Sequence, residues 1–146
     1  MKDSRIITEQ DLPAIAEKVI ETLASIATDR AKVLFLEGDL GAGKTTFTKE
    51  LAEVLGVERE DVHSPTFILK KEYVTKHDIF QKLIHIDAYR FENPIEANAL
   101  RLEHDLGNPT SLIVIEWPSK MNHQNPDMVI TLTVIDDETR EMEVNL

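Results

Sequence analysis

Residues 33–46 read Val-Leu-Phe-Leu-Glu-Gly-Asp-Leu-Gly-Ala-Gly-Lys-Thr-Thr. The apolar run 33–36 predicts a strand covered on both faces, because a strand with one face in water alternates apolar and polar residues. The glycines and the Lys-Thr pair at 38–45 match the pattern Gly-x-x-x-x-Gly-Lys-Ser/Thr. An amphipathic stripe over 47–55 then predicts a helix that ends at a glycine. A strand, this pattern and a helix in direct succession predict a phosphate-binding loop.

The residue types of this loop suit the phosphates of a nucleotide. Main-chain N–H groups at a helix N-terminus offer a fixed positive field, and glycines let the chain approach the phosphate oxygens. Lys44 supplies an ammonium group for the β- and γ-phosphates, and the Thr45 hydroxyl is short enough to bind Mg²⁺. We therefore expect a nucleotide with Mg²⁺ as the ligand. The other predicted nucleotide contacts in the loop are Asp39, Gly41, Ala42 and Gly43.

Two carboxylates follow apolar runs and are candidates for the metal side of the site. Asp87 follows residues 83–86, and Glu116 follows the more uniformly apolar residues 112–115. Carboxyl ends of parallel strands face the ligand in open α/β sheets. We favour Glu116 as the Mg²⁺-linked carboxylate and Asp87 as a water-positioning one. The alternative is that either carboxylate only caps a helix or pairs with Arg90.

Alternating strand and helix signals predict one α/β domain over residues 1–146, with no linker or repeat to divide it. The expected architecture is a mixed sheet of P-loop NTPase type, flanked by helices and closed by an antiparallel hairpin. The further expected elements are a helix that begins near 8–11 and extends to 26, a hairpin of strands 67–74 and 79–87, a helix at 93–106, a strand at 111–116, and a hairpin of strands 128–135 and 141–144.

Composition restricts the partners of the chain. Its 16 Lys and Arg face 27 Asp and Glu, and the net charge of -11 opposes extensive contact with nucleic acid. The absence of Cys excludes disulfides, thiolate nucleophiles and zinc-cysteine sites, and the five His lack ligand spacing. No apolar run approaches the roughly 18 residues of a membrane span. We therefore expect a cytoplasmic protein that does not bind membranes.

Two short segments have a functional and a purely structural interpretation. Residues 64–66, Ser-Pro-Thr, lie where switch-like segments approach a γ-phosphate, but such a sequence also forms an ordinary turn. Trp117 follows Glu116 directly and is either a core anchor or a residue over the nucleotide or at an interface.

Four sequence blocks occur in a fixed order along the chain. They are Gly-Asp-Leu-Gly-Ala-Gly-Lys-Thr-Thr at 38–46, Ser-Pro-Thr-Phe at 64–67, His-Ile-Asp-Ala-Tyr-Arg at 85–90 and Glu-Trp-Pro at 116–118. Jointly they resemble the TsaE (YjeE) family, the small ATPases of bacterial tRNA threonylcarbamoyladenosine biosynthesis. The resemblance spans essentially the whole chain.

The resemblance implies a Mg²⁺-dependent ATPase that acts with the TsaD and TsaB proteins, while TsaC makes the threonylcarbamoyl-adenylate. The modified base is the adenosine next to the anticodon, and the tRNA is contacted through the partners. By the same resemblance, Lys44, Thr45 and Thr46 are phosphate and Mg²⁺ ligands. Glu116 is the second Mg²⁺ ligand, and Asp87 is needed for hydrolysis.

The resemblance also implies two nucleotide contacts outside the four blocks. Glu9 lies near the N-terminal helix and Arg140 near the final hairpin, where the family's further contacts fall.

Two other functions could use the same loop. A small-molecule kinase usually needs several Arg on a mobile lid to exclude water, whereas this chain has six Arg and no Arg-rich segment. A GTPase would carry an Asn-Lys-x-Asp stretch for guanine, and the sequence has none. We therefore rank the kinase as the alternative to the ATPase and the GTPase below it.

Overall fold

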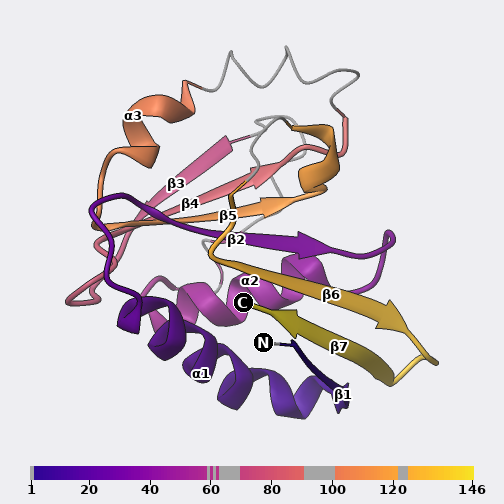
Figure 1. The fold of residues 1–146 in the computed structure, drawn as a ribbon. Coiled ribbons are helices and arrows are strands. Elements are labelled where there is room, and N and C mark those ends of the chain that lie inside the picture. The colour runs from indigo at the N-terminus through magenta and orange to yellow at the C-terminus, as the bar shows by residue number, and fades with distance from the viewer. Residues whose placement is uncertain (1, 59, 61, 63–69, 91–100, 122–124) are drawn as a thin grey trace.

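The computed structural model describes all residues except 1, 59, 61, 63–69, 91–100 and 122–124. The described elements form a seven-stranded sheet in the order β1-β7-β6-β2-β5-β4-β3, with helices against it (Figure 1). The strands are β1 (Lys2–Thr8), β2 (Lys32–Glu37), β3 (Lys70–Val74), β4 (Lys82–Asp87), β5 (Ser111–Glu116), β6 (Met128–Val134) and β7 (Thr139–Asn145). The helices are α1 (Leu12–Ser25), α2 (Lys44–Val54) and α3 (Leu102–Leu106), with short 3-10 turns at Glu9–Asp11 and Pro118–Lys120.

The centre of the sheet is parallel and its two sides are antiparallel. Strand β2 pairs in parallel with β5 and β6, and β5 pairs in parallel with β4. Strands β3, β7 and β1 add antiparallel pairs at the sides. This confirms the predicted mixed sheet and its closing hairpin. Because β2, β4 and β5 run in one direction, the residues that follow them meet at one edge of the sheet.

Strand β2 is covered on both faces, as its uniform apolar sequence predicts. Leu34 and Leu36 belong to the core cluster that contains Phe47 of α2 and the buried face of α1. Val33 and Phe35 belong to a second cluster on the opposite face, which includes Leu102 of α3. Figure 1 shows α1 and α2 together on one side of the sheet and α3 on the other side. An apolar layer therefore packs against each face of the central strands.

Most of the predicted elements are confirmed, with shifted ends. The N-terminal helix begins after a turn at Glu9–Asp11 and ends at Ser25, and α2 begins at Lys44, three residues before its apolar stripe. Gly56, predicted to end this helix, has a φ of +87°. The loop of the first hairpin extends to residue 81, beyond the predicted 78, and β7 begins at Thr139, two residues before the predicted strand.

Strand β1 was not predicted. Along Lys2–Thr8 only Ile7 is buried, while Ile6 is 58% exposed. A strand at the edge of a sheet has one pairing partner and here one buried side chain, so it carries no alternating apolar signal. The antiparallel pairing of β1 with β7 holds this segment as a strand, and the sequence of the segment alone does not indicate it.

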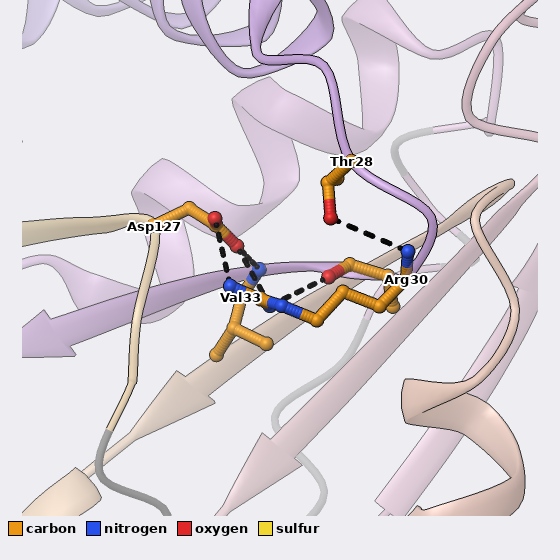
Figure 2. Close-up of polar contacts among 5 residues, drawn as sticks. Thr28, Arg30, Val33 and Asp127 are labelled. Carbon is orange, nitrogen blue, oxygen red and sulfur yellow. Dashed lines mark hydrogen bonds and ion pairs between the residues drawn. The ribbon is translucent and has the colours of Figure 1, made fainter.

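A polar contact joins the beginnings of β2 and β6. The Asp127 carboxylate accepts the Val33 N–H at 2.8 Å and lies 3.2 Å from a guanidinium nitrogen of Arg30. The main-chain N–H of Asp127 in turn donates to the Val33 carbonyl at 2.8 Å. Figure 2 shows the Asp127 side chain directed at Val33 and Arg30. These bonds fix where β6 joins the sheet, at the end of β2 opposite the glycine loop.

Two predictions concern residues outside the described part of the chain. These are the Ser-Pro-Thr segment at 64–66 and residues 93–100 of the helix predicted at 93–106. Arg101 is described and has a left-handed φ of +54°, so the predicted helix is wrong at this residue, and α3 begins only at Leu102. The strand predicted from residue 67 is described from Lys70 onward. In the described ranges, no helix combines the length and apolar character of a membrane span.

Candidate functional site

The glycine loop joins the end of β2 to the beginning of α2. Gly38 has a φ of +148° and Gly43 a φ of +107°, both in the region that disfavours side chains. A Cβ added to Gly38 would lie 2.5 Å from the carbonyl oxygen of Leu132 in β6. Gly43 is the N-cap of α2, so the free N–H groups of the first helical turn begin directly after it. The loop therefore presents the positive end of an 11-residue helix.

The Lys44 side chain turns back into this loop. Its ammonium lies 2.5 Å from the Gly38 carbonyl oxygen and 3.0 Å from that of Asp39. It also lies 4.6 Å from the centre of the Trp117 ring. Lys44 is 5% exposed, and this burial lowers the pKa of Lys44, while the charges of Glu116, Asp87 and Asp39 oppose the effect by raising it. A cation is thus held inside the turn that the sequence predicts to bind phosphate.

Glu116 and Thr45, the two predicted Mg²⁺ ligands, are in contact. The Thr45 hydroxyl donates to Oε2 of Glu116 at 3.4 Å. The same Oε2 is 2.5 Å from Nε2 of His85, and both Glu116 and His85 are buried. The sequence alone predicts no function for His85. The available signal was strand alternation, because His85 lies two residues before Asp87 in β4 and so on the same face of the sheet.

Asp87 lies beside Glu116 in the sheet register. Its carboxylate accepts the Tyr89 N–H at 3.0 Å, which holds the chain as it leaves β4. Asp87 is half-buried, and its charge acts on the Lys44 ammonium in the direction that raises the pKa of Lys44. The structure therefore gathers Lys44, Thr45, Asp87 and Glu116 at one edge of the sheet.

Five of the remaining predicted residues meet at a cavity on another side of the loop, and Asp39 and Gly41 do not line it. This cavity, of about 720 Å³, is lined by Ala42, Gly43 and Thr46 together with Glu9 and Arg140. Arg140 also donates from Nε to the Ala42 carbonyl oxygen at 3.1 Å, so β7 is attached directly to the loop. Glu9 enters from the turn before α1. Residues from both ends of the chain thus face the loop.

The donor atoms at the sheet edge suit a hard cation. Thr45 and Glu116 offer a hydroxyl and a carboxylate, and Mg²⁺ is usually bound by one or two protein oxygens together with phosphate and water. Within the described ranges, no three His, Cys, Asp or Glu side chains are grouped as a metal site. The fit is therefore to a cation that also has phosphate ligands, not to a cation held by the protein alone.

Comparisons with known proteins agree with this geometry. The sequence model of one family, described as threonylcarbamoyl adenosine biosynthesis protein TsaE, matches residues 7–144. The tRNA threonylcarbamoyladenosine biosynthesis protein TsaE of Bacillus subtilis is 39% identical over 127 residues, which cover 86% of this chain and 76% of that protein. The protein of the same name from Aquifex aeolicus is 30% identical, over 99% of this chain and 96% of its own length.

A solved structure extends the likeness to the fold. The crystal structure of Bacillus subtilis YdiB superposes with a TM-score of 0.70 and 31% sequence identity. The superposition covers 99% of this chain and 84% of that one. The mixed seven-stranded sheet with its helices is therefore shared over nearly the full length of the chain.

Proposed function

Because the chain belongs to the TsaE family, we propose that it is a Mg²⁺-dependent ATPase that serves threonylcarbamoyladenosine biosynthesis on tRNA. The names of its curated relatives support the pathway, and the loop before α2 supports the ligand. The proposal treats residues 1–146 as one P-loop domain. ATP, ADP and Mg²⁺ are its proposed ligands.

The position of the Lys44 ammonium carries the proposal. It lies against two carbonyl oxygens of its own loop, at the beginning of a helix whose first N–H groups are free to bind an anion. A buried ammonium group whose direct acceptors are neutral carbonyl oxygens is strongly stabilised when a phosphate binds beside it. The arrangement suits an anion of high charge, and a nucleotide phosphate chain meets that need.

The proposed chemistry is transfer of the γ-phosphoryl group to water. Bound Mg²⁺ would neutralise charge on the β- and γ-phosphates. The Lys44 ammonium and the loop amides hold the phosphates, and Thr45 and Glu116 supply the protein oxygens for the cation. Asp87 lies next to Glu116 in the sheet register. Its carboxylate accepts a hydrogen bond from the attacking water and so orients that water.

The cavity beside the loop is the proposed place of the nucleoside. Thr46 faces it from the first turn of α2, and Glu9 and Arg140 bound it from the turn before α1 and from β7. The loop residues Asp39, Gly41, Ala42 and Gly43 complete the proposed contacts through their main chain. Both hydrogen-bonding and charged groups are available there to a ribose and a base.

TsaD and TsaB are the proposed partners. A protein with a net charge of -11 is poorly suited to hold tRNA itself, so the partners hold the tRNA in this proposal. The chain has six Arg, and no sequence motif marks one of them as an arginine finger that would complete the site. We therefore propose slow turnover by the isolated protein and faster turnover in the assembly.

The test is ATP hydrolysis by the purified chain, alone and with purified TsaB and TsaD. We expect Mg²⁺-dependent release of phosphate that rises when both partners are present. Transfer of the γ-phosphate to a small metabolite in place of water would instead support the kinase alternative. Absence of hydrolysis in every combination, with folded proteins, would contradict the proposed function.

A further inference from the structure

One buried contact at the sheet edge has no role in the proposed chemistry. His85 in β4 is fully buried, and its Nε2 lies 2.5 Å from Oε2 of Glu116 in β5. The same oxygen accepts the Thr45 hydroxyl from α2. A single carboxylate oxygen therefore joins two strands and the helix that follows the loop.

The chemistry of the pair fixes its direction. A carboxylate that binds Mg²⁺ only accepts hydrogen bonds, so with Glu116 in its proposed role Nε2 of His85 is the donor in this contact. Within the described part of the chain, Nδ1 of His85 has no hydrogen-bond partner. The contact with Glu116 is therefore the polar interaction that orients the imidazole, and the imidazole in turn restrains the carboxylate.

Resting on the function proposed above, we propose that His85 is a positioning residue for Glu116. Its N–H holds the carboxylate beside Thr45, so that the two oxygen donors for the cation stay together. A Glu side chain has three rotatable bonds, and an unrestrained one would lose more conformational freedom when it binds the cation. Hydrogen bonds to metal ligands commonly contribute roughly 10- to 100-fold to metal affinity.

The position of His85 in the sheet supports a local role. His85 lies opposite Val114 in β5, and Asp87 lies opposite Glu116, so all four residues are on one face near the carboxyl ends of the strands. The flanking Ile84 and Ile86 point to the opposite face and belong to the second core cluster. A purely apolar residue would fill the His85 position equally well if packing were its only purpose.

The experiment compares two variants that differ in the donor. His85→Gln keeps an N–H group within reach of Glu116, whereas His85→Leu keeps similar volume and removes the donor. Binding of Mn²⁺ in the presence of ADP is followed by the loss of the free Mn²⁺ signal in electron paramagnetic resonance. His77→Gln, in the loop between β3 and β4, is the control for the loss of a histidine. Thermal unfolding of every variant is measured in parallel.

We expect His85→Leu to weaken Mn²⁺ binding roughly 10- to 100-fold, with His85→Gln and His77→Gln closer to the unchanged protein. Affinity for ADP in excess chelator should stay within a few-fold in all of them, because the loop contacts do not involve His85. Equal Mn²⁺ affinity in the unchanged protein and His85→Leu would overturn the role of His85 alone. If the unchanged protein binds neither ADP nor Mn²⁺, the proposed function itself fails, and the role of His85 with it.

A measurement without variants keeps the proposal testable if His85→Leu does not fold. Nitrogen-15 NMR of the imidazoles distinguishes the two neutral tautomers. We expect His85 to carry its proton on Nε2, and its Nε2 signal to shift when Mg²⁺ is added to the ADP-bound protein. A proton on Nδ1, or a signal that does not respond to Mg²⁺, would contradict the proposal.

Discussion

Two carboxylates at opposite ends of the central sheet have little-exposed side chains but different surroundings. The Asp127 side chain is 7% exposed and the Glu116 side chain 4%. Asp127 receives a main-chain N–H and a guanidinium, which together place a hydrogen bond on each of its two oxygens. Glu116 instead receives a hydroxyl and an imidazole on one oxygen, beside a loop that holds an ammonium group.

The difference separates a structural from a functional carboxylate. Asp127 is paired with the Val33 N–H and the Arg30 guanidinium, and these contacts hold β2 and β6 in register. Its charge therefore stabilises the fold. Glu116 is restrained but not neutralised by a direct ion pair with Lys or Arg in the described contacts. A buried anion without such a partner is costly unless a cation is bound in the working state. The comparison therefore predicts different consequences of removing each group.

The largest expected effect is the loss of turnover in Glu116→Ala. Removing the protein's carboxylate ligand should reduce Mg²⁺-dependent ATP hydrolysis more than 100-fold, on the order of 3 kcal/mol of transition-state stabilisation. Some ADP binding should persist, because the loop is unchanged. Steady-state phosphate release in the assembly with TsaB and TsaD measures the effect. Unchanged hydrolysis would contradict the role assigned to Glu116.

Gly38→Ala tests how tightly the functional end of the sheet is built. The added Cβ would meet the Leu132 carbonyl oxygen at 2.5 Å, and the residue would keep a positive φ. We expect a loss of about 2–4 kcal/mol in the free energy of unfolding, measured by urea titration. Gly43→Ala is the matched control, because its added Cβ has no neighbour within 4 Å and only the φ penalty applies. Equal losses in the two variants would show that contact with β6 is unimportant.

Asp127→Ala sharpens the comparison at the other end. We expect a loss of about 1–3 kcal/mol in the free energy of unfolding, since the Val33 N–H loses a charged acceptor and the partly exposed Arg30 loses its partner. Nucleotide affinity and hydrolysis by the folded fraction should not change. A large fall in ADP affinity at full folding would show that the two ends are not independent.

The two ends of the central sheet also differ in how well the sequence predicts them. The Gly-x-x-x-x-Gly-Lys-Thr pattern and the apolar run before it predict β2, the loop and α2. The apolar residues 112–115 predict a strand, and Glu116 lies at its end. These features depend on residues close together in the chain. The sequence therefore predicts Thr45 and Glu116 separately as oxygen ligands of Mg²⁺, and the structure adds that these two side chains, 71 residues apart, are in contact.

Contacts between distant residues were harder to predict. Asp127 and Arg30 are 97 residues apart, and His85 and Glu116 are 31 apart, so neither pair leaves a periodic signal. Strand β1 was missed because a polar edge strand is stabilised by its pairing with β7 and not by its own side chains. Glu9 and Arg140 were named only through resemblance, and the structure brings both to one cavity.

The smallest expected effect is on the pH dependence of nucleotide binding. Burial lowers the pKa of Lys44, and a bound phosphate favours the charged form and so raises the pKa of Lys44. Nucleotide affinity should therefore be highest below the pKa that Lys44 has in the nucleotide-free protein, and it should decline as the pH rises through that pKa. Because this pKa is lowered, the decline should begin at a lower pH than it would for an ordinary lysine. Fluorescence titration with a labelled ADP over alkaline pH measures this few-fold change.

Lys44→Arg is the control for this decline, because a guanidinium keeps its charge throughout the range. Its residual affinity should be independent of alkaline pH. The same decline in both proteins would assign the titration to another group.

The central claim is that the loop at 38–45 binds the phosphates of an adenine nucleotide, and calorimetric titration of ADP with Mg²⁺ tests it directly. We expect saturable binding to the unchanged protein at micromolar concentrations and no detectable heat of binding to a folded Lys44→Ala variant. Equal affinity in the two proteins, or no binding to either, would contradict the account.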